Sequence, residues 1–280
     1  MKSKMRWFLS TTIVIALCAL STSTFTQPEV HAQEERAAFR AAPHCNNGVA
    51  SGTYGYRMAG QLVGVGPFLV NGIFTHYPDG TMDGDVQLTL GSQQIPTKWS
   101  GGTFKTNNDC TGAGKFFVQA LNLEVTYNLI VTDGGEQIEL LNTNPGVVLH
   151  GVARRISRRG GLPPRCNNGT VLGAYGYRLD GSLPNVPAVA IGGVLTHSID
   201  SGYNGVLSGS DTVSFAGQYS PRANQGTYKL ESNCRGAAFY TDNLGNKVNY
   251  VFVAVDGGET IYFQGSDPGV ANTGVGQRIR

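Results

Sequence analysis

Two tyrosines and two histidines stand at matched places in this 280-residue chain, and these residue types can contact a ligand or move a proton. Tyr127 and Tyr250 each lie in an alternating β-type run, in which every second side chain shares a face. His76 and His197 each end an apolar run and follow a threonine. An imidazole titrates near neutral pH and can act as a general base. The four residues are therefore candidate ligand contacts inside a folded domain.

Each candidate also has a structural explanation. An inward-facing tyrosine is more often part of a core with its hydroxyl satisfied, and a histidine beside a turn is often half-exposed at a rim. Glu136 and Glu259 follow Asp-Gly-Gly turns, but one turn supplies too few oxygens for a calcium cage. A serine-nucleophile elbow, a phosphate-cradling glycine loop and a metal-binding helix motif are absent from the sequence. We predict no catalytic constellation, no cofactor and no metal site.

The matched positions arise because one domain is written twice. The phrase Cys-Asn-Asn-Gly followed by Tyr-Gly-Tyr-Arg begins at Cys45 and again at Cys166. An Asp-Gly-Gly-Glu turn and an Asp/Asn-Pro-Gly-Val turn also recur in the same order, as expected of an internal repeat. We therefore divide the chain into a first domain over 44–156, a linker over 157–164 and a second domain over 165–280.

Each copy contains two cysteines at nearly the same separation. An even number of cysteines in an exported chain indicates disulfides. Because each repeat should be closed by its own pair, we predict Cys45–Cys110 and Cys166–Cys234. A bridge over a loop of this length stabilises a fold by about 4 kcal/mol in the chain-entropy treatment. Zinc is the alternative, but the closely spaced cysteine pairs of a zinc site are missing.

The start of the chain has the pattern of a secretory signal peptide. Positive residues precede an apolar run over 7–20, and Val-His-Ala then offers a small-residue cleavage site before Gln33. A membrane anchor and a lipoprotein at Cys18 are the alternatives; polar residues interrupt the run, and a bulky leucine precedes the cysteine. We expect a signal peptide over 1–32, a flexible lead-in over 33–43, and a secreted protein, extracellular or periplasmic, without an integral membrane span.

Charge argues against a nucleic-acid partner. After residue 32 the acidic and basic residues are equal in number, and a nucleic-acid-binding protein needs a basic face. The one dense basic run, over 154–165, falls at the junction of the two copies. A run at that place is typical of a solvated linker or a protease-sensitive hinge.

Short runs rich in Val, Thr, Tyr and Phe, separated by glycine-rich turns, indicate an all-β fold. In the first copy we expect eight strands over 52–62, 67–77, 80–90, 94–107, 110–120, 124–132, 136–142 and 147–156. No long stretch shows the helical period. Eight short antiparallel strands favour a closed barrel, which leaves no sheet edge unpaired. A two-sheet sandwich is the alternative.

The order of these motifs resembles secreted bacterial domains with the allene oxide cyclase barrel, among the lipocalin-like (calycin-type) β-barrels. The resemblance rests on Gly-x-Tyr-Gly-Tyr, Gly-Thr-Tyr/Phe before Cys-x-Gly, Asp-Gly-Gly-Glu and Asp/Asn-Pro-Gly-Val, and it spans both copies. It implies an eight-stranded barrel with an apolar lumen, used in some relatives to fold a flexible substrate for cyclisation. No catalytic motif of a characterised cyclase matches residue by residue, so none is transferred.

The second copy has one apolar face without a counterpart in the first. Val251, Val253 and Val255 alternate with the inward residues around Tyr250. We expect this face to pack against the sister barrel or against another chain, because such a face is rarely left to water.

Together these patterns predict two tandem eight-stranded antiparallel β-barrels that bind a small apolar molecule in one or both lumens. One alternative is a cyclase- or isomerase-like enzyme that works by shape, with the two tyrosines or the two histidines as its polar handles. The other is a structural or surface-interaction protein with filled barrels. Binding without chemistry is favoured because no acid–base pair is visible in the sequence.

Overall fold

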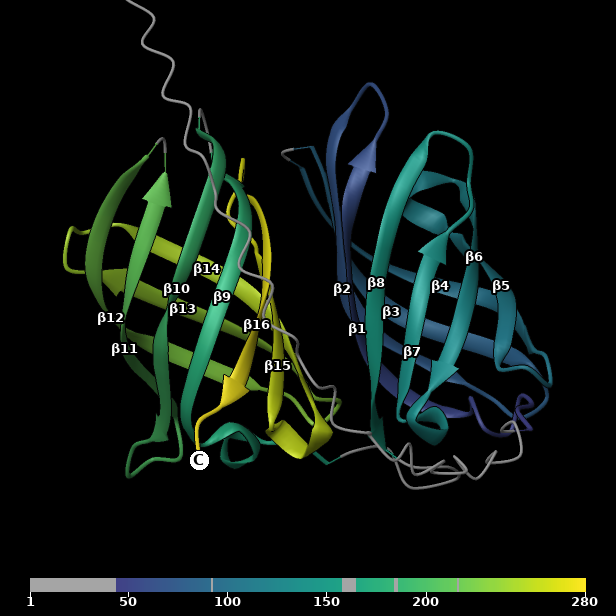
Figure 1. Ribbon diagram of the computed structural model, residues 1–280. Helices are drawn as coiled ribbons and strands as arrows, with labels where there is room; N and C mark the ends of the chain where they lie inside the picture. Colours follow the sequence, from purple (N-terminus) through teal and green to yellow (C-terminus); the bar gives the residue numbers. More distant parts are fainter. Residues whose placement is uncertain (1–43, 92, 158–164, 184–185, 216) are drawn as a thin grey trace, which may run out of the picture. The chain divides into compact units, whose positions relative to one another are not determined.

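The computed structural model describes residues 44–91, 93–157, 165–183, 186–215 and 217–280, and these residues are almost entirely β-strand (Figure 1). They form two closed antiparallel barrels in tandem, which confirms the predicted fold. Among these residues no helix has the length and apolar character needed to cross a bilayer. The predicted signal peptide, lead-in and most of the linker lie outside the described residues.

The first barrel contains the eight strands that the sequence predicts, each within two residues of the expected bounds. They are β1 (Gly52–Leu62), β2 (Gly66–His76), β3 (Thr81–Leu90), β4 (Gln93–Thr106), β5 (Thr111–Val118), β6 (Leu123–Thr132), β7 (Gln137–Asn142) and β8 (Val147–Ser157). Each strand pairs with its sequence neighbours, and β8 returns to pair with β1. That last pairing excludes the sandwich.

The second barrel repeats this meander with its own eight strands. They are β9 (Gly173–Leu183), β10 (Val186–Ile199), β11 (Gly205–Phe215), β12 (Gln218–Leu230), β13 (Arg235–Asp242), β14 (Lys247–Val255), β15 (Thr260–Gly265) and β16 (Ala271–Arg278). Closure comes from β16 pairing with β9. Four single-turn 3₁₀ helices lie in the connections: η1 (Gln119–Leu121), η2 (Asp133–Gly135), η3 (Asn168–Val171) and η4 (Asp256–Gly258).

Side-chain alternation determines which residues face each lumen. In β6 the side chains of Tyr127 and Leu129 are buried, whereas Asn128 between them is exposed. In β14 Tyr250 and Phe252 are buried in the same way. Each strand therefore contributes every second residue to a core inside its own barrel, as its sequence pattern predicts.

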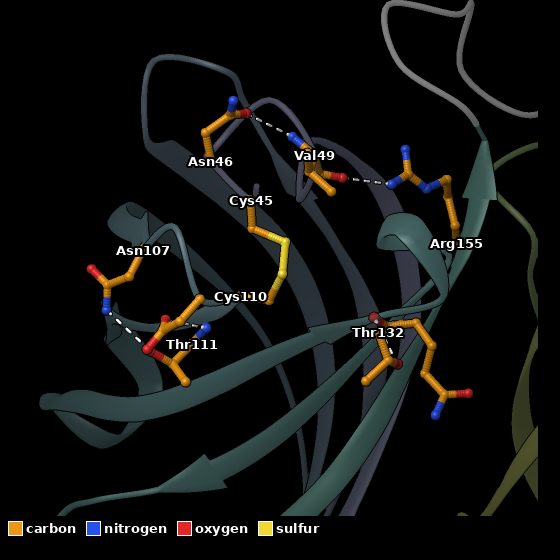
Figure 2. Close-up of a disulfide and its surroundings, with 10 residues drawn as sticks. Cys45, Asn46, Val49, Asn107, Cys110, Thr111, Thr132 and Arg155 are labelled. Carbon is orange, nitrogen blue, oxygen red and sulfur yellow. Dashed lines mark hydrogen bonds between the residues drawn. A yellow bond between two sulfur atoms is a disulfide. The ribbon is translucent and has the colours of Figure 1, made fainter. Parts of the chain in front are cut away.

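Both predicted disulfides are present. Cys45 bonds to Cys110 and ties the segment before β1 to the β4–β5 turn (Figure 2). Cys166 bonds to Cys234 at the matching place in the second barrel. Disulfides persist in oxidising compartments, so the pair indicates an extracytoplasmic environment.

An arginine, buried in the first barrel and half-buried in the second, closes the same end of each barrel. Arg155 donates hydrogen bonds to the carbonyl oxygens of Val49 and Gly135, both at 2.9 Å, and lies 5.2 Å from the centre of the Tyr54 ring. Gly135 has a φ of +94°, and a Cβ there would lie 2.2 Å from the Val49 oxygen, so the position requires glycine. Arg278 repeats the contact in the second barrel. Part of the basic run is thus structural and not a solvated linker.

The valine face of β14 is buried in part. Val253 and Val255 are 1% and 0% exposed and form an apolar cluster with Tyr262 and with Ile73 of the first barrel. Val251 is half-buried and lies outside that cluster. Burial of two valines on the outer face of a barrel explains why this strand is apolar on both sides.

Candidate functional site

The two lumens differ in the space that their side chains leave. The cavity in the first barrel has a volume of about 50 Å³, and apolar residues provide nearly all of its lining. The cavity in the second barrel has a volume of about 840 Å³. Sites for small organic molecules typically measure about 300–1,000 Å³. Of these two cavities, only the second can hold such a molecule without rearrangement.

Large side chains fill the first lumen. Trp99 is 2% exposed and stacks on Phe116, with 4.2 Å between the ring centres. Phe74 of β2 also packs near it, with 6.5 Å between the centres of the Phe74 and Trp99 rings. Tyr127 lines the remaining space, and its hydroxyl lies 3.0 Å from the sulfur of Met82. This interior is packed as a core.

Strand register shows which residues occupy equivalent positions in the two barrels. His76 pairs with Met82 between β2 and β3, and His197 pairs with Leu207 between β10 and β11. Counting along the strands from these equivalent pairs, four lumen positions carry apolar or small residues in the first barrel and charged or polar residues in the second. Val86, Thr97, Trp99 and Val118 of the first barrel are replaced by Asp211, Arg222, Asn224 and Asp242 of the second.

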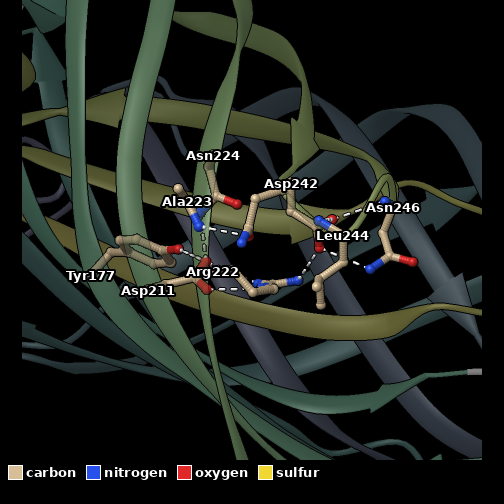
Figure 3. Close-up of polar contacts among 9 residues, drawn as sticks. Tyr177, Asp211, Arg222, Ala223, Asn224, Asp242, Leu244 and Asn246 are labelled. Atoms are coloured by element: carbon tan, nitrogen blue, oxygen red, sulfur yellow. Dashed lines mark hydrogen bonds and ion pairs between the residues drawn. The ribbon is translucent and has the colours of Figure 1, made fainter.

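Asp211 is the centre of the resulting polar cluster (Figure 3). Its side chain is 0% exposed and accepts two hydrogen bonds from Arg222, at 2.8 Å from Nε and 2.9 Å from Nη2. It also accepts a hydrogen bond from Asn224 Nδ2 at 2.8 Å and one from the Tyr177 hydroxyl. Three of these donors reach Oδ2 and one, Arg222 Nε, reaches Oδ1, so Asp211 holds Arg222 in place through both oxygens. Asp211 itself is not among the residues that line the cavity.

Asp242 is the second buried carboxylate of the cluster. One of its oxygens accepts hydrogen bonds from the backbone N–H groups of Leu244 and Asn246, at 2.9 and 2.8 Å. The other accepts from Asn246 Nδ2 at 2.9 Å and lies 3.5 Å from Nη1 of Arg222. Burial alone would raise the pKa of this carboxyl group, but these hydrogen bonds outweigh burial and the pKa is lowered.

Arg222 is the charged side chain of this cluster that lines the cavity, where it is accompanied by the neutral side chains of Tyr177 and Asn246. Its side chain is 10% exposed and forms part of the cavity lining. Burial would lower the pKa of the guanidinium group, but the hydrogen bonds to Asp211, together with the nearby negative charge of Asp211 and the neighbouring Tyr240 and Tyr177, outweigh burial and the pKa is raised. The tyrosine beside it, Tyr240, has a pKa raised by burial to about 12. At neutral pH the site presents a fixed cation next to neutral phenols.

A buried ionic cluster is costly to keep in a barrel interior. Desolvating charged groups costs several kcal/mol each, and well-packed apolar residues at such positions are often equally or more stabilising. The first barrel folds on the same framework with apolar residues at three of the four positions. The fold itself therefore does not require the polar cluster.

The two tyrosines predicted as ligand contacts both line lumens, but their hydroxyls differ. The Tyr127 hydroxyl lies 3.3 Å from His76 Nε2 as well as beside Met82. The Tyr250 ring lines the large cavity, and its buried hydroxyl has no hydrogen-bond partner. Burial raises the pKa of both phenols, so both are neutral.

The two histidines predicted as ligand contacts lie at the closed ends of the barrels. His76 is 1% exposed and stacks on Phe104, and His197 is 2% exposed between Tyr175 and Tyr228. Both are buried, not half-exposed at a rim. Burial lowers the pKa of His76 to about 3 and that of His197 to about 4, so neither imidazole is charged at neutral pH. Neither lines the two lumen cavities, and their role as ligand contacts stays a prediction.

Sequence reasoning missed the polar cluster. The available signal was Asp211, which shares its strand face with Leu207, Val213 and Phe215 and so had to point into the barrel. Within the described residues no group of three or more His, Cys, Asp and Glu side chains is placed to hold a metal ion.

Comparisons with known proteins add no function. No protein-family model matches the chain, and no curated protein sequence matches it. A solved structure from the DUF3598 family of Nostoc punctiforme, of unknown function, aligns with 82% of this chain and 97% of its own. The sequence identity is 10% and the TM-score 0.20. Fold and site by themselves define the class: a tandem eight-stranded β-barrel protein with one filled and one open lumen.

Proposed function

We propose that the protein binds one small, mostly apolar molecule in the lumen of the second barrel, while the first barrel is a packed structural partner. The observation that carries this proposal is the contrast between the lumens, about 50 Å³ against about 840 Å³ on one framework. Leu179, Ile191, Val213 and Phe263 line the larger cavity. Burying apolar ligand surface against them contributes about 25 cal/mol per Å².

Binding without chemistry is the better candidate for this site. A general base needs a free lone pair within reach of the substrate. Asp211, Asp242 and the two histidines do not line the cavity, and Asp267, which does, accepts a hydrogen bond from Asn249 on each of its oxygens. A cyclase-type enzyme, as the allene oxide cyclase resemblance implies, would have to work by shape and by the charged groups of the lining, Arg222, Lys247 and Asp267. We keep that activity as the second candidate.

We also propose that the protein acts after export through its predicted signal peptide. The two disulfides support this location. N-terminal sequencing of the protein from its own host is expected to begin at Gln33. A mature protein that begins at Met1 would contradict export with cleavage.

The binding proposal can be tested by introducing the tryptophan of the first lumen at the equivalent position of the second lumen. In the first barrel a Cβ at Gly84 would lie 2.6 Å from the Trp99 ring, so the indole packs directly over that glycine. Gly209 occupies the same register position opposite Asn224. The substitution Asn224→Trp therefore places an indole opposite Gly209 and beside Leu195, which lines the cavity, and we expect the indole to occupy part of the cavity.

The measurement is the fluorescence of N-phenyl-1-naphthylamine, an uncharged lipophilic reporter, titrated into the full chain. We expect saturable binding to the wild-type protein and its loss in Asn224→Trp. Val70→Ile is the matched control, because it gives the first lumen the residue that the second carries at that position, Ile191. Binding that is absent from the wild type, or unchanged by Asn224→Trp, would overturn the proposal.

A further inference from the structure

We infer that the second lumen selects an uncharged ligand, an apolar body bearing a hydroxyl or carbonyl oxygen, over the carboxylate form of the same body. The inference deepens the proposed function and rests on it. It follows from the charges and free hydrogen-bonding groups of the cluster around Asp211 and Arg222.

The cluster disfavours an anionic ligand because it already carries excess negative charge. Arg222 contributes one positive charge, whereas Asp211 and Asp242 each contribute one negative charge, and both carboxylate side chains are 0% exposed. Lys247 also lines the cavity, but it is exposed to solvent, where its charge is screened. A ligand carboxylate would add a second net negative charge in a site of low dielectric.

A neutral oxygen fits what remains. The guanidinium group of Arg222 has five N–H donors; three of them are directed at the two carboxylates, and the group also contacts the Tyr240 hydroxyl. The Arg222 side chain lines the cavity, so a donor that remains there can reach a ligand. A hydroxyl or carbonyl oxygen can accept from this group without bringing charge, while the rest of the ligand contacts the apolar wall.

Competition between two head groups on one alkyl chain tests the inference. N-phenyl-1-naphthylamine bound to the full-length protein is displaced at neutral pH by 1-decanol or by decanoate. We expect 1-decanol to compete at least about tenfold more strongly than decanoate. Equal or stronger competition by decanoate would overturn the inference while leaving the proposed function intact. If neither the reporter nor either of the two molecules bound, both would fail.

A matched pair of variants assigns the selectivity to the cluster. Asp242→Asn removes one buried charge but keeps an oxygen for the backbone N–H groups of its turn, and we expect the preference for decanol over decanoate to narrow at least about threefold. Asp200→Asn is the control, because Asp200 makes the same set of turn hydrogen bonds to Gly202 and Asn204 on the exposed surface. A preference that stays the same in Asp242→Asn, or that falls equally in Asp200→Asn, would contradict the role of lumen charge.

Discussion

Replacing Tyr250 with phenylalanine is expected to stabilise the second barrel, whereas replacing Tyr127 is expected to destabilise the first. The two tyrosines occupy equivalent positions in β14 and β6, and both are 5% exposed. The Tyr250 hydroxyl is buried without a partner. The Tyr127 hydroxyl lies 3.0 Å from Met82 Sδ and 3.3 Å from His76 Nε2.

The expected magnitudes have opposite signs. An unsatisfied buried polar group costs about 1–3 kcal/mol, so Tyr250→Phe should raise the free energy of unfolding by about 1 kcal/mol. Tyr127→Phe removes a made hydrogen bond and leaves His76 Nε2 without it, which should lower the free energy of unfolding by about 1–2 kcal/mol. The two variants should therefore differ by about 2–3 kcal/mol, although the chemical change is identical.

Urea denaturation followed by far-UV circular dichroism measures both effects. The fluorescence of Trp99, the only tryptophan after residue 32, reports the first barrel separately. A variant that changes the transition midpoint without changing its slope has changed stability alone. If both variants lowered the midpoint by similar amounts, the Tyr250 hydroxyl would have to be hydrogen-bonded, and our account of the polar groups in the second lumen would be wrong.

Three further predictions concern the framework. Replacing Cys166 and Cys234 together with alanine should lower the free energy of unfolding by about 4 kcal/mol in urea denaturation. Because burial depresses the pKa of His76 from 6.5 to about 3, and that of His197 to about 4, stability is full above pH 6.5 and falls as the unfolded chain takes up protons. As the pH falls from 6.5 to 5, each histidine should lower the free energy of unfolding by about 2 kcal/mol. Replacing both with leucine should make the urea midpoint depend less on pH over that range. Trp99→Ala should open a cavity in the first lumen and cost about 3–5 kcal/mol, measured by thermal unfolding.

The fold follows from local patterns in the sequence. Glycine-rich turns divide each copy into eight runs, and the alternation around Tyr127 identifies the inward face of β6. One cysteine pair in each repeat suffices to predict the disulfides. These features depend on residues close in the sequence or on the repeat itself, so they can be predicted without a structure.

The polar cluster was hidden by a one-residue slip in register. Alignment of the copies at Gly102 and Gly226 sets Trp99 against Ala223, which is exposed. A bulge in β4, seen as a register shift between β4 and β5, changes that correspondence, and the true counterpart of Trp99 is Asn224. A slip of one residue exchanges the inner and outer faces of a strand. The cavity volume also could not be predicted from the sequence, because it depends on how side chains from all the strands pack together.

Native mass spectrometry of the protein purified from its own host tests the central claim most directly. Our account predicts one extra mass per chain, lost when the protein unfolds and absent from Asn224→Trp. The polypeptide itself should be four hydrogens lighter than its reduced form, because it contains two disulfides. A wild-type protein that carries no extra mass, and that takes up neither N-phenyl-1-naphthylamine nor 1-decanol when they are added, would contradict a binding lumen in the second barrel.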